Sequence, residues 1–502
     1  MTPERIKSVV IVGGGTAGWM TAAALSRFLD NGYTKVTLIE SDEIGTVGVG
    51  EATIPTIAQF NRLLDIDEDA FVAATQGTFK LGIQFVDWAR LGDNYFHPFG
   101  NYGIDLNGLD FHQIYLKFGR QAAAHPLHAY SLCTSAAQHS RFDRAGDPKS
   151  PLGRVDYAYH FDAGLYARFL RAYAKRGRVQ RVEGKIVGVA QAENGHVTSV
   201  TLDNGREIEG ELFIDCSGFR GLLIEETLHA GYEDWSSWLP CDRAVACPST
   251  NGGDPVPYTR ATARAAGWQW RIPLQHRTGN GHVYSSAYTD KDTATALLLA
   301  NLAGDQLAEP RHLSFKAGRR REAWKANVVA IGLAAGFLEP LESTSIHLIQ
   351  SGISKLLALF PDARFAAIER DEYNRLMKAA YDGVRDFIIL HYHATTRTDT
   401  PFWNHVRTME VPDSLHRKLE LFRSKGRVFR YDDELFSVTS WVAVLLGQGV
   451  TPLDYDPVVD ALDDRRVQTA MGEMATDIAR IVRAMPTQAA FIAAHCRAAA
   501  VG

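Results

Sequence analysis

The sequence predicts an α/β protein that combines a doubly wound parallel sheet with an inserted β-meander and a helical C-terminal lobe. Three observations lead to this fold class. A continuous apolar run at Ser8–Val12 passes through glycines into an Ala-rich segment, as a buried parallel strand followed by a helix requires. Short strand-like segments with Asn-Gly turns between them occupy residues 186–214. Apolar residues recur at helical spacing from Ile346 onward.

Length and composition indicate a globular protein with more than one lobe. The chain has 502 residues, 46% of them hydrophobic and 22% charged, and one hydrophobic core rarely serves so long a chain. We expect residues 1–350 to form the sheet domain, with its catalytic and substrate segment at about 75–130. Residues 351–502 should form a helical lobe that covers the substrate site. The net charge of −5 gives no reason to expect nucleic acid or an anionic membrane as partner.

The cysteines and the apolar stretches favour a cytoplasmic location. The five cysteines are dispersed, with no CxxC pair and no zinc-ligand spacing, so we expect reduced thiols and no metal. No signal-peptide pattern is visible, and the apolar stretches 328–338 and 438–446 are too short or too interrupted to span a bilayer.

A GxGxxG motif occupies residues 13–18, between the first strand and a helix expected at about 16–29. Its glycines allow a tight turn, close approach of a pyrophosphate and close helix–strand packing, and the helix N-terminus offers amides to phosphate. The second strand, residues 35–39, ends at Glu40, 22 residues after the motif, where an acidic residue binds an adenosine ribose. A Gly-rich turn without a ligand is the alternative, which this context disfavours. The expected cofactor contacts here are Gly13, Gly15, Thr16, Ala17, Gly18 and Glu40.

Two later segments indicate that the dinucleotide is FAD. Strands at 186–191, 197–202 and 207–214 bring the chain back to the main sheet, where Asp215 opens the sequence Asp-Cys-Ser-Gly. Flavoprotein monooxygenases use such a strand end as their second FAD contact, whereas an NAD dehydrogenase normally shows no such return. Residues 328–336 predict the last strand and turn in contact with FAD. The sheet domain is therefore expected to be of the FAD-binding GR2 or monooxygenase-like type.

The remaining elements follow in order along the chain. A helix entered at about 155–165 should end near Gly177. Further strand-like segments occupy residues 239–300, and the chain is mostly helical after residue 346. We find no internal repeat and no low-complexity tract.

The string Gly-Trp-Gln-Trp-Arg-Ile-Pro at residues 267–273 is the most specific in the chain. Trp268 and Trp270 lie on one face of a strand, so a plain β-core is one interpretation. The string also resembles the WxWxIP signature of the flavin-dependent halogenases, the tryptophan halogenase family. In that family it is thought to shield the flavin site from organic substrate.

Further segments resemble the same family in the same order, from residue 9 to about 350. Residues 48–55 are similar to its flavin strap, residues 79–82 to the stretch with its catalytic lysine, and residues 337–344 to the stretch with its catalytic glutamate and halide turn. Residues 159–163 and 215–221 match as well. The C-terminal third matches much less.

The resemblance implies an enzyme that uses FADH2, O2 and a halide ion, chloride or bromide, to make hypohalous acid. Lys80 would hydrogen-bond this acid or form a haloamine, and Glu342 would polarise it or take the arene proton. Alone, Lys80 would be read as a surface charge and Glu342 as a first-turn acid. The backbone amides of Thr344 and Ser345 would bind the halide at a helix N-terminus, where simple N-capping is the alternative. The family usually has glycine where this chain has Ser345, which leaves the halide preference open. Further FAD contacts are implied at Ala52, Val187, Leu333 and Ile346.

The acceptor site is expected to hold an electron-rich aromatic ring. His97-Pro98-Phe99 resembles the His-x-Phe that flanks the indole plane in the family, and flat aromatic walls hold such a ring by stacking. Where enzymes of free tryptophan carry a Tyr-Tyr pair, this chain has Trp441-Val442. The resemblance therefore implies an indole rather than free tryptophan, with His97, Phe99 and Trp441 at the ring.

Other functions remain open at this point. An FAD-dependent aromatic hydroxylase shares the fold but does not require the two tryptophans or the Lys80 and Glu342 pair, and a flavin-binding protein without turnover is a second alternative. No NADH site is apparent, so a separate flavin reductase is the expected partner, beside a small aromatic substrate.

Overall fold

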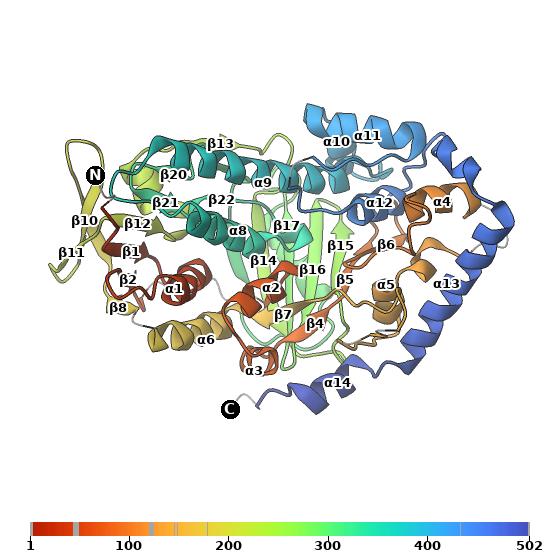
Figure 1. The fold of residues 1–502 in the computed structure, drawn as a ribbon, viewed down its shortest axis with the longest axis horizontal. Coiled ribbons are helices and arrows are strands. Elements are labelled where there is room, and N and C mark those ends of the chain that lie inside the picture. Colours follow the sequence, from red (N-terminus) through yellow and green to blue (C-terminus); the bar gives the residue numbers. More distant parts are fainter. Residues whose placement is uncertain are drawn as a thin grey trace. The chain divides into compact units, whose positions relative to one another are not determined.

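The computed structural model describes residues 4–43, 50–119, 125–144, 146–147, 149–177, 179–431 and 433–499. Its chain forms two compact units that alternate along the sequence. Figure 1 labels the helices and strands of the chain. Unit 1 comprises Met1–Thr75, Phe161–Leu239 and Ser314–Asp382, and unit 2 comprises Gln76–His160, Pro240–Leu313 and Gly383–Gly502. This division differs from the expected boundary at residue 350, because each unit assembles strands and helices from three separated stretches of chain.

Unit 1 is built on a six-stranded sheet with the order β20-β21-β12-β1-β2-β8. The strands are β1 (Ser8–Val12), β2 (Lys35–Glu40), β8 (Gln180–Glu183), β12 (Leu212–Asp215), β20 (Trp324–Lys325) and β21 (Val328–Ala330). All neighbours pair in parallel except β20, which runs antiparallel at the edge. Helix α1 (Thr16–Phe28) joins β1 to β2. The predicted strand–helix–strand opening and the return of the chain at residue 215 are thus confirmed.

The predicted meander forms its own three-stranded sheet, from β9 (Ile186–Gln191), β10 (Val197–Leu202) and β11 (Glu207–Glu209). Both Asn-Gly turns end in glycines of left-handed conformation, Gly195 at φ 82° and Gly205 at φ 79°. The expectation of one strand over 207–214 is wrong. Gly210 N–H still donates to Thr198 of the meander at 3.1 Å, whereas Glu211 N–H donates to Ser8 of the main sheet at 3.2 Å. The chain therefore changes sheet between these two residues.

The helix expected to start within 155–165 is α6 (Ala163–Arg176), and it ends next to Gly177 as predicted. Residues ahead of it form a strand instead, β7 (Ala158–Asp162), because Tyr159 and Phe161 suit a pleated, buried strand. The carboxylate of Asp162 caps the helix by accepting from Leu165 N–H at 3.0 Å.

The other elements of unit 1 are short strands and helices around this sheet. They are β3 (Gly50–Ala52), α2 (Thr56–Leu63), α3 (Glu68–Ala74), β13 (Tyr232–Asp234), β19 (Gly318–Arg320), β22 (Gly336–Phe337), α8 (Ser345–Ala358) and the first part of α9 (Ala367–His393).

Unit 2 is built on a seven-stranded sheet with the order β18-β14-β17-β16-β15-β5-β6. Its strands are β5 (Gly82–Val86), β6 (Asn94–Pro98), β14 (Arg243–Ser249), β15 (Thr259–Arg264), β16 (Gly267–Pro273), β17 (Thr278–Tyr284) and β18 (Arg311–Ser314). A separate strand, β4 (Thr78–Lys80), pairs antiparallel with residues 158–160 of β7.

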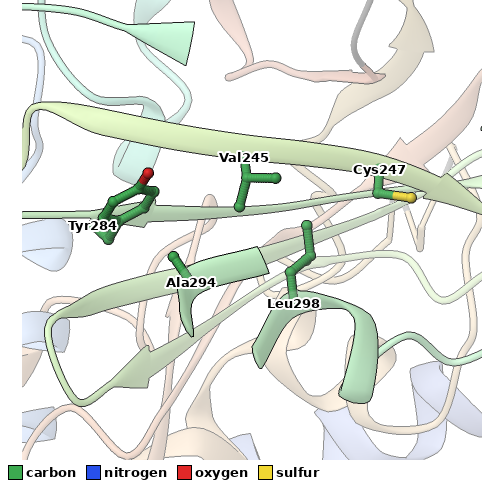
Figure 2. Packing of buried hydrophobic residues seen from close by; sticks show 5 residues of the cluster. All are labelled: Val245, Cys247, Tyr284, Ala294 and Leu298. Carbon is green, nitrogen blue, oxygen red and sulfur yellow. The ribbon is translucent and has the colours of Figure 1, made fainter. Parts of the chain in front are cut away.

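Helix α7 (Lys291–Ala300) packs on this sheet, although the sequence analysis expected strand-like segments around residues 239–300. Figure 2 shows Ala294 and Leu298 of α7 against Val245 and Cys247 of β14 and Tyr284 of β17. The start of the helix has a local signal, because the carboxylate of Asp290 accepts from Thr293 N–H at 2.8 Å.

The C-terminal part of unit 2 is helical, as predicted. Its helices are α10 (Pro401–Thr408), α11 (Asp413–Lys425), α12 (Val438–Gly447), α13 (Asp464–Ala484) and α14 (Gln488–His495), and earlier in the chain lie α4 (Phe111–Phe118) and α5 (Leu132–Gln138). Among the described helices, none is long and apolar enough to cross a membrane.

Candidate active site

The turn between β1 and α1 has the geometry of a phosphate cradle. Gly13 adopts φ 107°, and a Cβ at this residue would lie 2.4 Å from the carbonyl oxygen of Cys216. The N-cap of α1, Gly15, offers no side-chain cap, and the first turn of the helix contains no acidic residue. The first amides of α1, from Thr16 and Ala17, are therefore left for an external acceptor such as phosphate.

Glu40 lies at the end of β2 beside this turn, as the sequence predicted. One carboxylate oxygen accepts from Trp19 Nε1 at 3.0 Å, and the other is bound by Arg181 and lies 3.3 Å from Arg171. A carboxylate has about four acceptor positions, so Glu40 can still accept a ribose hydroxyl. The two arginines were not among the expected site residues, since they come from α6 and β8, far along the chain.

Asp215 is placed at the end of β12, but its carboxylate is fully buried and used by the protein itself. It accepts from the amides of Ser217, Leu223 and Ile224 at 2.9, 2.8 and 2.9 Å. Asp215 therefore shapes the turn that lies against Gly13, and a direct side-chain contact to a cofactor would need one of these bonds to be shared.

The remaining predicted cofactor contacts divide into two groups. Gly332, next to Leu333, brings its turn so close to α1 that a Cβ would lie 2.7 Å from the side chain of Ala17. Ala52 is buried on β3, and Ile346 lies in the first turn of α8. Val187, by contrast, is 64% exposed on the meander sheet and is not brought to the six-stranded sheet. Residues 48–49 of the predicted strap lie outside the described residues.

The predicted halide turn leads into α8 and is buried. Ser343 adopts a left-handed conformation at φ 59°, and Thr344 follows it as the N-cap without any side-chain cap bond. Simple N-capping is therefore not what the Thr344 hydroxyl does. Thr344 is 1% exposed, and its hydroxyl finds no hydrogen-bond partner among the described residues. Uncapped amides and an unused hydroxyl together suit a small anion.

Helix α8 itself adds no negative charge next to this turn. The first turn of α8 holds no acid, and burial lowers the pKa of His347 to about 4, with Lys355 acting in the same direction. His347 Nδ1 lies 3.1 Å from the hydroxyl of Thr56, which also donates to Gln350 at 3.2 Å. Because His347 is neutral, it neither attracts nor repels an anion strongly. Glu342, just before the turn, is 1% exposed.

Lys80 is the last residue of β4 in unit 2 and is fully buried. It is therefore not an ordinary surface lysine. Its ammonium lies 5.0 Å from the ring centroid of Phe99, a cation–π contact. The structure thus brings together Lys80, a predicted catalytic residue, and Phe99, a predicted substrate-binding residue.

A buried histidine holds the strand that carries Lys80. His160 Nδ1 lies 2.9 Å from the hydroxyl of Thr78, and its Nε2 lies 2.9 Å from the hydroxyl of Thr259. Thr78 itself donates to the carbonyl of Pro273 at 2.7 Å. Burial, together with the charge of Lys80, holds the pKa of His160 well below its usual range. Lys80 is therefore anchored beside a neutral imidazole.

Trp268 and Trp270 project from the same face of β16, with ring centroids 6.1 Å apart. They are 1% and 7% exposed. Gly281 of β17 lies opposite Trp270, and a Cβ there would meet the indole at 2.0 Å. The absence of a side chain at Gly281 therefore leaves space for the indole ring of Trp270.

Two of the predicted acceptor residues, His97 and Trp441, belong to a buried aromatic cluster in unit 2. Phe387 of α9 lies 5.6 Å from His97 and 5.0 Å from Trp441, as ring centroids, and stacks on Phe436 at 3.7 Å. Sequence reasoning missed Phe387 and Phe436, because no local pattern distinguishes them from ordinary helix and loop aromatics. Lys418 lies 4.9 Å from the ring of Trp441 and is paired with Glu434.

Among the described residues, no group of His, Cys, Asp or Glu side chains could hold a metal ion.

Comparison with known proteins extends these observations over the whole chain. A family model for tryptophan halogenase matches residues 8–464. The chain is 36% identical to the tryptophan 6-halogenase of Streptomyces toxytricini, covering 98% of this chain and 99% of that protein. It is 34% identical to the tryptophan 7-halogenase of Lentzea aerocolonigenes, covering 84% and 82% of the two chains.

Solved structures give the same result at higher identity. A flavin-dependent halogenase from Xanthomonas campestris superposes with a TM-score of 0.96 at 49% identity, covering 99% of this chain and 100% of that one. A flavin-dependent halogenase from a Brevundimonas strain superposes with a TM-score of 0.94 at 51% identity, covering 98% and 99%.

Proposed function

The chain belongs to the tryptophan halogenase family and is a flavin-dependent halogenase, and we propose that it makes hypohalous acid at one site and halogenates an indole at another. The observation that carries the two-site proposal is the placement of Lys80. A buried ammonium over the ring of Phe99, in the unit that holds the aromatic cluster, suits capture of an electrophile next to an arene.

We propose that the parallel sheet of unit 1 is an FAD-binding, doubly wound sheet of the GR2 type. The residues present fit the group, because the α1 amides are uncapped and the turn at Gly13 leaves no room for a Cβ. The pyrophosphate would lie over Gly13, Gly15, Thr16, Ala17 and Gly18, with the adenosine ribose at Glu40. Ala52, Leu333 and Ile346 are proposed further contacts, Asp215 shapes the adjoining turn, and Val187 has the weakest support.

Bound FADH2 supplies the two electrons with which O2 converts halide and a proton into hypohalous acid and water. Thr344 and Ser345 would hold the halide through backbone amides, and the buried hydroxyl of Thr344 can add a donor. Bromide should be used better than chloride, because it is easier to oxidise and to desolvate. Trp268 and Trp270 would keep organic substrate out of the flavin site.

The second step replaces one ring hydrogen of the acceptor with halogen and releases water. Lys80 would donate a hydrogen bond to the hypohalous acid, or carry the halogen as a haloamine, and so direct the electrophile at the ring. Glu342 would take the proton that leaves the ring carbon. His97, Phe99 and Trp441 would bind the arene by stacking. A separate flavin reductase is the proposed source of FADH2.

An assay with chemically reduced FAD, O2, bromide and indole tests this function. We expect bromoindole, formed only when all four are present and identified by its bromine isotope pattern. A hydroxylated indole that needs no bromide would contradict the proposal and identify an aromatic hydroxylase. Binding of FAD without any product would instead favour a flavin-binding protein without turnover.

A further inference from the structure

The seven-stranded sheet of unit 2 has one closed and one open face in its β5–β15–β16 part. The side chains of Ala261, Ala263, Trp268 and Trp270 alternate onto one face and are buried. Their chain neighbours Arg260, Thr262, Arg264 and Arg271 alternate onto the other face and are only half-buried. The open face is thus opposite to the tryptophans, and helix α7 packs on the same face farther along the sheet, over β14 and β17.

Three arginines gather on this open face. Arg260 of β15 lies directly opposite Arg271 of β16 in the strand register, and Arg264 is on the same side of β15. Like charges directly opposite each other on adjacent strands are destabilising. The sequence nevertheless places guanidinium groups at both positions.

The protein orients these arginines without neutralising them. Arg260 Nε donates to the amide oxygen of Gln84 at 2.9 Å, and Arg264 donates twice to the amide oxygen of Gln269 at 3.2 and 2.8 Å. Arg271 donates to the carbonyl of Asn301 at 3.0 Å. Within the described part of the chain, none of the three makes an ion pair with a carboxylate. Each guanidinium carries five N–H donors, so most of them remain available.

Burial and mutual repulsion both act on the pKa values of the cluster. Burial, followed by the charges of Arg260 and Arg264, lowers the pKa of Arg271, and burial lowers the pKa of Arg264. Asp87 opposes the shift of Arg264, and Tyr258 opposes that of Arg271. His282, on the next strand, is held neutral by burial and adds no charge. The cluster therefore has a net positive charge that no neighbouring carboxylate of the described chain cancels by direct pairing.

We propose that Arg260, Arg264 and Arg271 form a second anion site, for the phosphate or diphosphate group of a small molecule. The guanidinium fork matches two phosphate oxygens with two parallel hydrogen bonds, whereas a halide ion has only one acceptor centre. Arg260 and Arg264 are four residues apart on one strand, about 13 Å at the backbone, so a diphosphate fits the cluster better than a single phosphate. A bound anion would relieve the repulsion that the free protein carries.

Binding of inorganic pyrophosphate and inorganic phosphate to the FAD-saturated protein, at constant ionic strength, tests this site. Saturation with FAD keeps the phosphate cradle at Gly13 occupied. Calorimetry should show saturable binding, tighter for pyrophosphate than for phosphate, and none for chloride at the same concentration. Arg260→Gln should weaken pyrophosphate binding roughly tenfold or more, since a charge-assisted bond is lost. Arg271→Lys should weaken it as well, because the charge stays but the fork is lost.

Arg243→Gln is the matched control. Arg243 lies on β14 of the same sheet but is already paired with Asp242 at 2.8 Å, so its loss should leave binding unchanged. In the absence of anion, Arg260→Gln should be at least as stable as the wild type. Equal binding by wild type, Arg260→Gln and Arg271→Lys would overturn the proposal, and so would equal binding of chloride. FAD affinity and bromination are measured for the same variants, and neither should change in Arg260→Gln. A failure of the anion site is therefore distinguishable from a failure of the halogenase proposal.

Discussion

Gly18 illustrates at the scale of single residues how the first turn of α1 is built. A Cβ at Gly18 would lie 1.8 Å from the carbonyl oxygen of Gly13, which is backbone and can move only if the turn itself is displaced. Gly18→Ala should therefore displace the Gly13 turn and lower the affinity for FAD by roughly a hundredfold or more. Quenching of flavin fluorescence measures this affinity.

Gly472 provides the control for that change. It also lies inside a helix, α13, but a Cβ there would meet nothing within 4 Å. Gly472→Ala should stabilise the protein by about 0.5–1 kcal/mol and leave FAD binding unchanged. If both alanine variants bind FAD like the wild type, the assignment of the cradle is wrong.

His282 is the residue that should give the protein a measurable acid dependence. Burial lowers its pKa from 6.5 to about 4, so the folded state favours the neutral imidazole. The unfolded chain binds the proton more readily between these values. The stabilisation is therefore complete above pH 6.5 and is lost as the pH falls towards about 4.

Urea unfolding at a series of pH values tests this dependence. The wild type should lose up to about 3 kcal/mol more than His282→Gln between neutral pH and about pH 4. His416→Gln, which changes an exposed histidine of α11, should follow the wild type. Parallel curves for wild type and His282→Gln would show that His282 does not contribute.

Sequence predicted which residues lie at the site better than it predicted what they do there. Glu40 and Asp215 are both found at strand ends beside the glycine turn, because the motif spacing determines this. The use of the Asp215 carboxylate by three amides, and the pairing of Glu40 with Arg181, depend on segments that are remote or have no motif. Such contacts have no local signal.

At the scale of elements, the start of α8 is the feature most open to test. The hydroxyl of Thr344 is buried without a partner among the described residues, which costs stability unless a ligand uses it. Thr344→Val keeps the shape and the backbone amide but removes this hydroxyl. It should leave the ligand-free protein as stable as the wild type or up to about 1 kcal/mol more stable.

The same variant should raise the KM for bromide roughly tenfold, because one donor to the anion is lost. Steady-state bromination and thermal unfolding measure the two effects. Thr56→Val, which removes a hydroxyl bonded to His347 and Gln350, is the control for a general disturbance of α8. A Thr344→Val enzyme with unchanged KM would show that only backbone amides hold the halide.

Helix α12 should determine which indole the enzyme prefers. Trp441 and Val442 are buried there, and neither side chain offers a hydroxyl to an amino-acid headgroup. Desolvating an ammonium and a carboxylate without partners costs several kcal/mol. Indole should therefore be brominated with a higher kcat/KM than L-tryptophan in a direct competition. A preference for L-tryptophan would contradict this interpretation of α12 and leave the halogenase assignment intact.

Element boundaries were predictable where a motif or a turn residue marks them. The β1–α1–β2 opening and the Asn-Gly turns are found as expected. The change of sheet at Gly210 and helix α7 were missed, since the first depends on pairing with remote strands. Helix α7 is marked in the sequence only by its N-cap residue Asp290, and the strand-like pattern around that residue favoured strands instead.

At the scale of the whole molecule, the chain alternates between two units, and the predicted reactive residues divide between them. The cofactor turn, Glu342 and the halide turn belong to unit 1, whereas Lys80, the two tryptophans and the aromatic cluster belong to unit 2. A single boundary near residue 350 does not separate the two units, because the strands of each sheet come from distant stretches of the chain. The order of motifs along the chain therefore identified the site residues without giving their grouping.

The central claim, that halide oxidation and arene halogenation occur at separate sites, is tested most directly with Lys80→Met. Methionine fills much of the buried space of the lysine but has no charge and no donor. Lys117→Met is the control, since that lysine is an ion-paired residue of α4. FADH2 oxidation by O2 and formation of bromoindole are measured in the same reactions. The account predicts that Lys80→Met oxidises FADH2 at the wild-type rate and forms no bromoindole, while Lys117→Met does both. Loss of FADH2 oxidation in Lys80→Met, or wild-type bromination by it, would contradict the two-site account.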